Sequence, residues 1–408
     1  MQDGLDWAWT LRVVWSRHDR VKAPPLVVGG DPVRLGRRVD GASDLEIPDD
    51  KRMSRHHATI AQSASGGLML SDAGSHNGCQ VNGTTAMSAA LQDGDVVRMG
   101  STILVVRRAP RADPPPAIDG LRGDGVAMAM LRARMHRLAR TDTVVLILGE
   151  PGTGKGAAAK ALHELSMRRG PFVETNLLYQ GSATARVGQS AIASDGWIKS
   201  ADGGTVHIES VGDVPMGAQA RLGALVDSHR PGPSRKGVRF VCSAVHDLDG
   251  LAAAGKFTVD LARKLSERVI VMPALRERCE DVPRLILRKL HSDQSISAEL
   301  VEALMLFPWT RNAADVERVV AVLREGSRSE PLQLRALEGR WPPTAPPPPL
   351  LVDPPCGPAE LQERVRRAGG VAQLAKSLRR TTREVHRWFQ RAGLEPVMGP
   401  EHSPLDGV

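Results

Sequence analysis

Two proline-rich stretches, Pro110 to Pro116 and Pro342 to Pro355, interrupt the chain. Such runs adopt extended polyproline conformations, which neither a helix nor the interior of a sheet accommodates. A chain of 408 residues is also too long for a single hydrophobic core. We therefore expect three folding units joined by two linkers. The units span residues 8–108, 120–340 and 357–396, and the linkers span 109–119 and 341–356.

The first unit consists of short β-type runs separated by Gly, Asp, Asn and Ser turns, a rhythm that predicts an all-β sandwich. The runs are Leu11–Val14, Leu26–Val28, Val33–Leu35, His57–Ile60, Leu68–Leu70, Val96–Met99 and Ile103–Val106.

The second unit alternates apolar strands with amphipathic helical stretches such as Ala157–Leu165 and Ala218–Val226. This alternation predicts a parallel α/β sheet. The expected strands are Val144–Leu148, Thr205–Ile208, Val238–Val241 and Val269–Met272. The third unit has helical periodicity alone.

Composition excludes several classes of protein. The hydrophobic fraction of 41% is ordinary, and no apolar run approaches the roughly 20 residues that span a bilayer. Because acids precede the first apolar stretch, the N-terminus is unlike a secretory signal, and we expect a cytoplasmic protein without membrane contact. The four cysteines, Cys79, Cys242, Cys279 and Cys356, form no Cys-x-x-Cys pair, which supports neither a disulfide framework nor a zinc site.

Five short motifs follow one another in the first unit. They are Gly36-Arg37, Ser54-Arg55-His56-His57-Ala58, Asp72-x-Gly74-Ser75-x-Asn77-Gly78, Val81-Asn82-Gly83 and Leu91-x-Asp93-Gly94-Asp95. Together, over roughly Trp9 to Arg108, they resemble the forkhead-associated (FHA) domain, whose members read phosphothreonine in partner peptides. Guanidinium, hydroxyl and amide donors on loops between strands suit a phosphate dianion.

The resemblance implies a role for each polar residue of these motifs. The phosphate would be bound by Arg37, Ser54, Arg55 and Asn77. Asn77 or Asn82 would hold the peptide backbone, and His57 would brace the loop from inside. A plainer interpretation stays open for part of this set, since Asn-Gly pairs form hairpin turns and His57 is then a core histidine.

A phosphate-binding loop opens the second unit. Its residues, Gly149-Glu150-Pro151-Gly152-Thr153-Gly154-Lys155, follow an apolar strand and precede the helix Gly156–Leu165. In this setting backbone N–H groups and the helix N-terminus face a β-phosphate, and the lysine reaches the β and γ oxygens. The candidate nucleotide-binding residues are therefore Gly149, Glu150, Gly152, Thr153, Gly154, Lys155 and Gly156. ATP is the expected ligand, although such a loop can also persist as a simple connector.

From Asp124 to about Glu325 the chain resembles the AAA+ domain of sigma-54-dependent activators, which implies a helical lid on the α/β domain. The resemblance rests on the phosphate loop and on five further motifs. These are Ala161-x-His163-Glu164-Leu165-Ser166, Gly170-Pro171-Phe172-Val173-x-x-Asn176, Ala201-Asp202-Gly203-Gly204-Thr205, Leu275-Arg276-Glu277-Arg278-x-Glu280-Asp281-Val282-Pro283 and Pro308-Trp309. In that family a ring, usually a hexamer, hydrolyses ATP and drives a GAFTGA loop against sigma-54.

The departures from that family gather where hydrolysis takes place. Glu209-Ser210 replaces the Asp-Glu pair that binds Mg²⁺ and polarises water, so Glu209 alone is left to hold a hydrated Mg²⁺. Val245 replaces the sensor asparagine. Thr258 and Lys264 replace the two trans-acting arginines, Ala314 the second-sensor arginine and Gly156 a glutamate. The stretch Leu177–Ser200 is too short for the sigma-contacting loop and lacks GAFTGA, so contact with sigma-54 is not expected.

The third unit contains three short helical stretches, Leu361–Ala368, Val371–Leu378 and Thr382–Ala392, and the densest run of arginines in a chain of net charge +8. It resembles the Fis-type helix-turn-helix. The resemblance implies that Thr382, Arg383, His386 and Arg387 face the major groove of DNA.

Two hypotheses follow. The first is a transcription regulator that binds DNA, senses a phosphothreonine protein, and keeps its AAA+ domain as a scaffold or a nucleotide-responsive homo-oligomeriser without hydrolysis. The alternative is a working ATPase that activates sigma-54 promoters.

Overall fold

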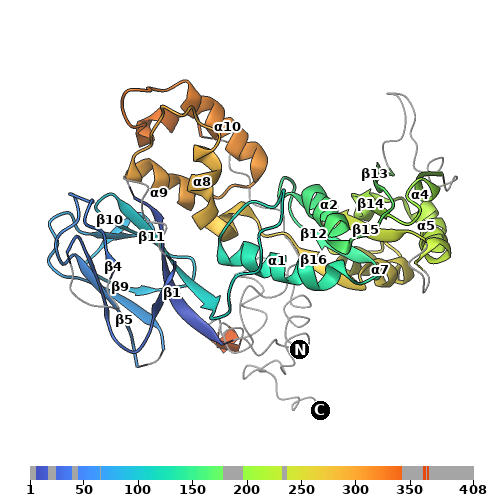
Figure 1. Cartoon of the computed structure of the whole chain (residues 1–408), viewed down its shortest axis with the longest axis horizontal. Helices are drawn as coiled ribbons and strands as arrows, with labels where there is room; N and C mark the ends of the chain where they lie inside the picture. The colour runs from blue at the N-terminus through green and yellow to red at the C-terminus, as the bar shows by residue number, and fades with distance from the viewer. Residues whose placement is uncertain are drawn as a thin grey trace, which may run out of the picture.

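The computed structural model describes residues 6–16, 24–38, 45–64, 66–177, 196–231 and 237–341, together with 362, 363, 365 and 366. These residues form a β domain, an α/β domain and a helical subdomain that lies between them along the molecule (Figure 1). The predicted recognition-helix residues Thr382, Arg383, His386 and Arg387 lie outside the described residues, as do residues 178–195 of the expected sigma-contacting segment.

The β domain is a sandwich of two sheets, as the sequence predicts. One sheet has the order β2-β1-β11-β10-β7-β8 and the other β4-β3-β5-β6-β9. The strands of the first sheet are β1 (Trp7–Trp15), β2 (Leu26–Val28), β7 (Cys79–Val81), β8 (Thr84–Ala86), β10 (Val96–Met99) and β11 (Thr102–Pro110). Those of the second are β3 (Val33–Gly36), β4 (Leu45–Glu46), β5 (Ala58–Gln62), β6 (Leu68–Asp72) and β9 (Ser88–Leu91). β11 thus extends through Pro110, into the segment expected to be a linker.

The α/β domain contains a five-stranded sheet of order β13-β14-β15-β12-β16, and every strand pair in it is parallel. Its strands are β12 (Val145–Leu148), β13 (Phe172–Asn176), β14 (Thr205–Glu209), β15 (Arg239–Ala244) and β16 (Arg268–Val271). This arrangement confirms the predicted fold class. The sequence did not single out β13, since a glycine and a proline precede it and only its first two residues are apolar.

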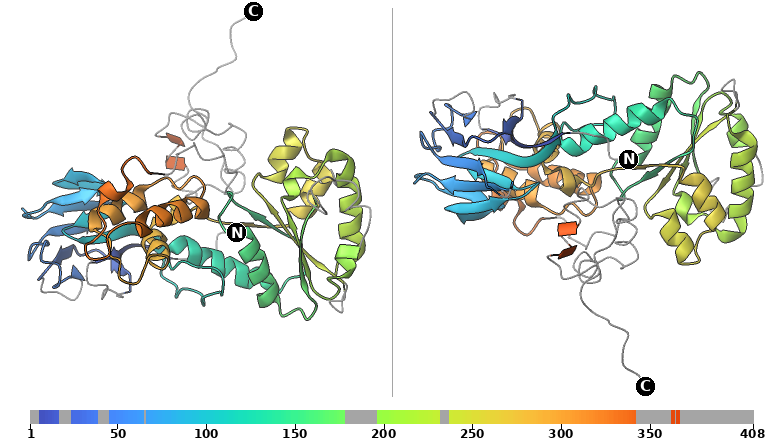
Figure 2. Two further views of the ribbon diagram at one scale, coloured as in Figure 1. Left: turned by 90° about the horizontal axis from the view of Figure 1, so that it is seen from above. Right: turned by 90° about the horizontal axis from the view of Figure 1, so that it is seen from below.

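Helices cover both faces of this sheet. One face packs against α1 (Val126–Ala139) and α2 (Lys155–Ser166). The other packs against a group of shorter elements: α4 (Gly196–Lys199), η1 (Val211–Asp213), α5 (Met216–His229), α6 (Leu248–Ala253) and α7 (Val259–Leu265). Figure 2 shows these layers edge-on.

The helical subdomain follows β16 and has its own apolar core around Trp309, which is fully buried. Its elements are η2 (Leu275–Asp281), α8 (Val282–Leu287), α9 (Ala298–Leu306), α10 (Ala313–Arg324) and η3 (Leu334–Leu337). α9 begins at a serine cap, because the Ser297 hydroxyl accepts a hydrogen bond from the Leu300 N–H at 3.2 Å. None of the helices in the described part of the chain is long and apolar enough to cross a membrane.

Strands β10 and β11 of the β domain add one face to the core around Trp309, while their other face lines a separate core inside the sandwich. Along β10 and β11 successive side chains alternate between the two faces of the sheet. Val97 and Leu104 point into the sandwich, whereas Val96, Ile103 and Val105 belong to the core around Trp309. Both faces of these strands are therefore buried.

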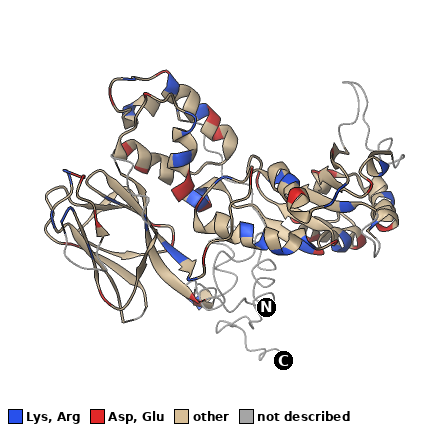
Figure 3. Cartoon of the chain, in the orientation of Figure 1, with Lys and Arg blue, Asp and Glu red and all other residues tan. Residues whose placement is uncertain are grey.

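Two ion pairs lie at this contact. Arg98 on β10 donates from Nε to the Glu302 carboxylate of α9 at 2.7 Å, and both side chains are at most 10% exposed. Arg107 on β11 pairs with Glu280, whose side chain is 1% exposed. Charges this deeply buried need their partners. The two contacts fix how the sheet faces the helices, and the acidic and basic residues at this junction are visible in Figure 3.

Removing one partner of the buried pair should destabilise the junction. We expect Arg98→Ala to lower the free energy of unfolding by about 3–5 kcal/mol, because Glu302 is left as a buried, uncompensated charge. Arg328→Ala is the matched control, since Arg328 pairs with Asp293 at 3.6 Å with both side chains more than half exposed; it should cost less than about 1 kcal/mol. Urea denaturation measures both values, and equal losses would contradict the role given to the buried pair.

Candidate functional site

The predicted phosphate-binding residues lie on three loops at one end of the β sandwich. A close backbone approach joins the first two loops. A Cβ added to Gly36 would lie 1.9 Å from the Arg55 carbonyl oxygen, so only glycine fits there. The Arg37 N–H then donates to the Ser54 carbonyl at 2.9 Å. Arg37 is thereby held beside Ser54 and Arg55.

The third loop is tied to the second by side-chain hydrogen bonds. The Ser54 hydroxyl oxygen accepts from the His76 N–H at 3.1 Å, and the Asn77 amide donates to the Arg52 carbonyl at 2.6 Å. The structure therefore brings four of the predicted residues, Arg37, Ser54, Arg55 and Asn77, to the same set of connected loops.

His57 is completely buried beneath these loops. Its Nδ1 accepts from the Ser54 N–H at 3.0 Å, and its Nε2 lies 3.1 Å from the Gly78 carbonyl oxygen. One imidazole thus connects the loop that carries Ser54 to the loop that carries Asn77. The sequence suggested that His57 either braces the loop from inside or is a core histidine. In the structure it does both.

The guanidinium groups of Arg37 and Arg55 have no anionic partner among the described residues. Arg55 is exposed and Arg37 is half-buried, and no described side chain pairs with either guanidinium. Two forked, positively charged donors on rigid loops form a suitable receptor for a dianion.

Asn82 does not join this group. Its amide nitrogen donates to Asp95 at 2.8 Å and its amide oxygen accepts from the Val96 N–H at 2.9 Å. Its backbone is left-handed, with φ at 50°, a conformation that asparagine tolerates in turns. Its backbone thus forms the turn between β7 and β8, as in the plainer interpretation of this Asn-Gly pair, while its side chain is bonded to the start of β10.

The P-loop has the strand-loop-helix geometry that its sequence predicts. Gly152 and Gly154 have φ of 77° and 97°, which brings the chain from β12 into α2 at Lys155. The lysine Nζ donates to the carbonyls of Gly149 at 2.8 Å and Glu150 at 3.0 Å. Burial lowers the pKa of Lys155, while the carboxylates of Glu209 and Glu150 oppose this shift. The turns and the lysine fit a phosphate chain.

The helical subdomain is fastened to this loop through Glu150, which is completely buried. Arg276 of η2 donates to one carboxylate oxygen at 2.7 Å. Asn312 donates to the same carboxylate at 3.0 Å and to the Pro151 carbonyl at 3.0 Å. The Gly152 carbonyl also accepts from the Ala313 N–H at 3.3 Å. Glu150 and Arg276 were visible in sequence motifs, but nothing in the sequence indicated that they pair.

The positions expected to hold metal and activate water lie at the end of β14. Glu209 is the last residue of the strand, and the following Ser210 has a left-handed backbone with φ at 52°. A serine hydroxyl is too weakly basic to take a proton from water as a general base. Val245, at the sensor position just beyond β15, offers no hydrogen bond. A nucleotide phosphate fits the loop, whereas only one carboxylate remains at this position for its Mg²⁺.

The remaining departures lie near α7 and α10. Lys264 donates to Asp227 at 2.7 Å and lies 3.0 Å from Asp260, so its charge is neutralised within the chain. Thr258 is the N-cap residue of α7, and Ala314 is exposed in the first turn of α10. These contacts leave Lys264 poorly placed to reach a phosphate in a neighbouring subunit.

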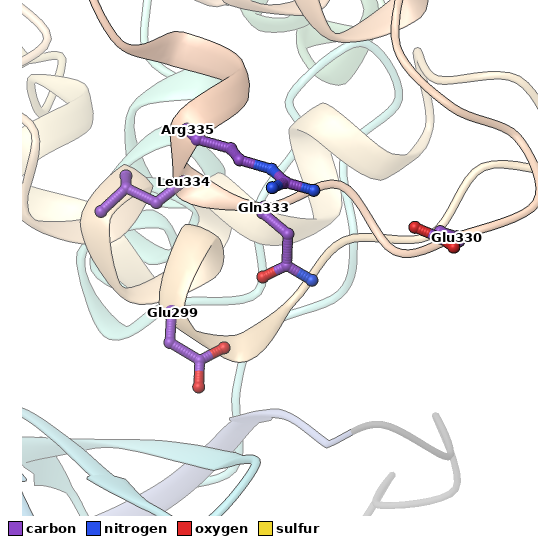
Figure 4. A pocket seen from close by; sticks show the side chains of 5 residues that line it. All are labelled: Glu299, Glu330, Gln333, Leu334 and Arg335. Carbon is purple, nitrogen blue, oxygen red and sulfur yellow. The ribbon is translucent and has the colours of Figure 1, made fainter.

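A hollow on the helical subdomain is separate from both candidate sites. Its volume is about 580 Å³, and Figure 4 shows the side chains that line it, Glu299, Glu330, Gln333, Leu334 and Arg335. No residue predicted to bind phosphate, nucleotide or DNA lines it.

Comparison with known protein families gives one match to the β domain and one to the α/β domain. Residues 33–100 match the FHA domain, and residues 123–275 match the sigma-54 interaction domain. The chain contains an FHA domain and a sigma-54 interaction domain. The first match covers the three connected loops, and the second covers the P-loop and the whole parallel sheet.

Several curated bacterial regulators are similar to the second domain. The Nif-specific regulatory protein of Rhizobium etli is 33% identical over 213 residues, which cover 47% of this chain and 36% of that protein. The DNA-binding transcriptional regulator NtrC of Rhizobium meliloti is 30% identical over 249 residues, covering 54% and 51%. The chain is thus homologous to NtrC-type sigma-54 regulators, and it spans about half of their length or less.

Solved structures are similar over the same two regions. NtrX from Brucella abortus in complex with ATP is 24% identical, covers 67% of this chain and 69% of its own, and has a TM-score of 0.45. An FHA domain from a study of phosphothreonine-dependent interactions is 29% identical, covers 25% of this chain and 98% of its own, and has a TM-score of 0.22.

Proposed function

We propose that this protein is a DNA-binding transcription regulator that senses a phosphothreonine-containing partner through its FHA domain, while its AAA+ domain neither hydrolyses ATP nor remodels sigma-54. The observation that carries the first part is the pair of guanidinium groups, Arg37 and Arg55, which pair with no side chain among the described residues. Their loops are joined by hydrogen bonds to those that carry Ser54 and Asn77. A scaffold of this kind places its donors before the ligand arrives, which lowers the entropic cost of binding.

The non-hydrolytic part of the proposal rests on the end of β14 and on α7. Glu209-Ser210 supplies one carboxylate and no base, and Lys264 is already paired with two carboxylates. The P-loop itself supports nucleotide binding, and NtrX, a structure similar to this chain, was solved with ATP. ATP binding without turnover would give the AAA+ domain a structural or assembly role.

A junction between the two domains provides a route for the signal. The Arg52 carbonyl accepts a hydrogen bond from the Asn77 amide at 2.6 Å. The Arg52 guanidinium donates a hydrogen bond to Glu299 of α9 at 2.8 Å. A peptide that engages Asn77 would therefore act on a residue that also contacts the helical subdomain, which in turn holds the P-loop through Glu150.

The alternative function is an active sigma-54-dependent ATPase. The intact P-loop and the similarity to NtrC favour it. DNA binding is common to both functions. It is supported by the regulators to which the chain is homologous and by the arginine-rich stretch that contains Arg383 and Arg387.

Replacement of Arg37 should reduce the preference for phosphorylated over plain peptides. We expect Arg37→Ala to weaken binding of a phosphothreonine peptide about ten- to hundredfold, because a hydrogen bond to a charged group contributes about 1.5–3 kcal/mol. Calorimetric titration against a phosphothreonine peptide library measures the loss. Arg111→Ala is the control, since Arg111 is an exposed arginine that pairs with Asp6. Equal binding of phosphorylated and unphosphorylated peptides by the unaltered protein would refute phosphothreonine recognition.

Phosphate release from ATP should stay at background at every protein concentration. Loss of the trans-acting arginines alone typically removes about 10³–10⁵ in rate. Lys155→Ala should therefore behave like the unaltered protein, and Ser210→Glu should restore nothing, because the other losses are independent. Turnover that depends on Lys155 would instead establish the active ATPase.

Deletion of all residues after Pro355 should remove DNA binding. We expect the affinity of the full chain to fall steeply with salt, since arginine contacts to phosphates release counterions. Fluorescence anisotropy with a labelled duplex at several salt concentrations tests both statements. Retention of DNA affinity by the truncated chain would show that the arginine-rich segment is only a solvated surface.

A further inference from the structure

Two groups of side chains in the described part of the chain have the composition and spacing of metal ligands. One is His57, Asp72 and Cys79 in the FHA domain, and the other is Glu174, His207 and Glu209 in the AAA+ domain. Within each group the candidate ligand atoms all lie within 4.8 Å of one another. The two groups differ in the hydrogen bonds that their candidate ligand atoms already make.

In the FHA group, the candidate ligand atoms of His57 and Asp72 are already hydrogen-bonded within the FHA domain. Both ring nitrogens of His57 face backbone groups, and the Asp72 carboxylate accepts from the Ser75 N–H at 2.7 Å and the Ser75 hydroxyl at 2.7 Å. Burial raises the pKa of the Cys79 thiol, with a further contribution from Asp72. A protonated thiol and a fully bonded imidazole are poor ligands.

The AAA+ group is built differently, by strand register. His207 and Glu209 are two residues apart on β14, so their side chains share one face of the sheet. Glu174 is the register partner of His207 on the adjacent strand β13 and shares that face. The three residues therefore converge near the carboxyl ends of two neighbouring strands, beside the P-loop.

His207 has the surroundings of a metal-binding histidine. Its side chain is completely buried, its Nε2 lies 3.0 Å from the Ser243 hydroxyl, and its Nδ1 lies 2.9 Å from a Glu174 carboxylate oxygen. Metal-bound histidines typically have their second ring nitrogen held by another polar group, as Ser243 does here. The partner of Nδ1 is itself a candidate ligand, so a cation placed between the two atoms would be bound by both.

Both carboxylates are available. Glu174 is 48% exposed and its carboxylate is bonded to His207 alone among the described residues. Glu209 is half-buried and accepts no hydrogen bond from a described residue. Gly156, at the start of α2, lies beside Glu174, since a Cβ built there would be 3.4 Å from the Glu174 carboxylate oxygen, an ordinary contact.

We propose that Glu174, His207 and Glu209 bind one divalent transition-metal cation, of the class of Zn²⁺ or Co²⁺, and that they do so without nucleotide. One imidazole nitrogen and two carboxylate oxygens suit such cations, which bind nitrogen and oxygen ligands at about 2.0–2.2 Å. Mg²⁺ strongly prefers oxygen and water, so it should compete poorly. Three protein ligands leave a coordination position for water. The cation would take the lone pair of Nδ1 in place of the present contact between Nδ1 and Glu174.

Titration of the full chain with Co²⁺, in the absence of nucleotide, tests the site. We expect one equivalent to bind, with a visible absorption band that excess Zn²⁺ abolishes and Mg²⁺ does not. Zn²⁺ should also raise the melting temperature, because it binds the native state.

Ligand variants locate the bound ion. Glu174→Gln should weaken Co²⁺ binding at least about tenfold, since removal of even a supporting group around a metal costs about 10- to 100-fold in affinity. Glu174 is half exposed, so this variant should fold even if His207→Asn does not. Cys79→Ser, from the FHA group, is the matched control and should bind like the unaltered chain. The proposal is overturned if the unaltered chain binds no Co²⁺, or if Glu174→Gln and Glu209→Gln bind it as tightly as the unaltered chain does.

Discussion

The buried contact between the FHA sheet and the helical subdomain determines how the parts of this molecule act on one another. Val96, Ile103 and Val105 complete a core whose centre is Trp309, and Arg98 reaches Glu302 across the same surface. Apolar residues exclude water from this contact. The buried ion pair therefore forms only when the sheet and the helices are in one relative orientation. The FHA domain and the helical subdomain therefore form one packed unit, and the α/β domain meets that unit at the P-loop.

The P-loop is consequently linked by a short chain of contacts to the FHA loops that carry Arg52 and Asn77. Glu150 is buried between Arg276 and Asn312, and the same helical subdomain holds Arg52 through Glu299. The Lys155 Nζ lies within the P-loop, where it donates to the carbonyls of Gly149 and Glu150.

Sequence reasoning located the candidate sites better than it assigned their details. The motifs correctly placed Arg37, Ser54 and Asn77 on loops and the P-loop between a strand and a helix, because both rely on local turn chemistry. They did not distinguish Asn77 from Asn82, although each precedes a glycine. Only the contacts with Asp95 and Val96 show that the Asn82 amide is consumed within the fold.

The sequence by itself determined the order of the FHA and sigma-54 interaction domains, the β sandwich and the parallel sheet. These follow from local periodicity and from residue identity at fixed spacings. Tertiary structure alone decided that both faces of β10 and β11 are buried, that Glu150 pairs with Arg276, and that Glu174 lies beside His207. Each of these contacts joins segments far apart in the chain, and no local pattern encodes a partner that only strand register and domain packing bring near.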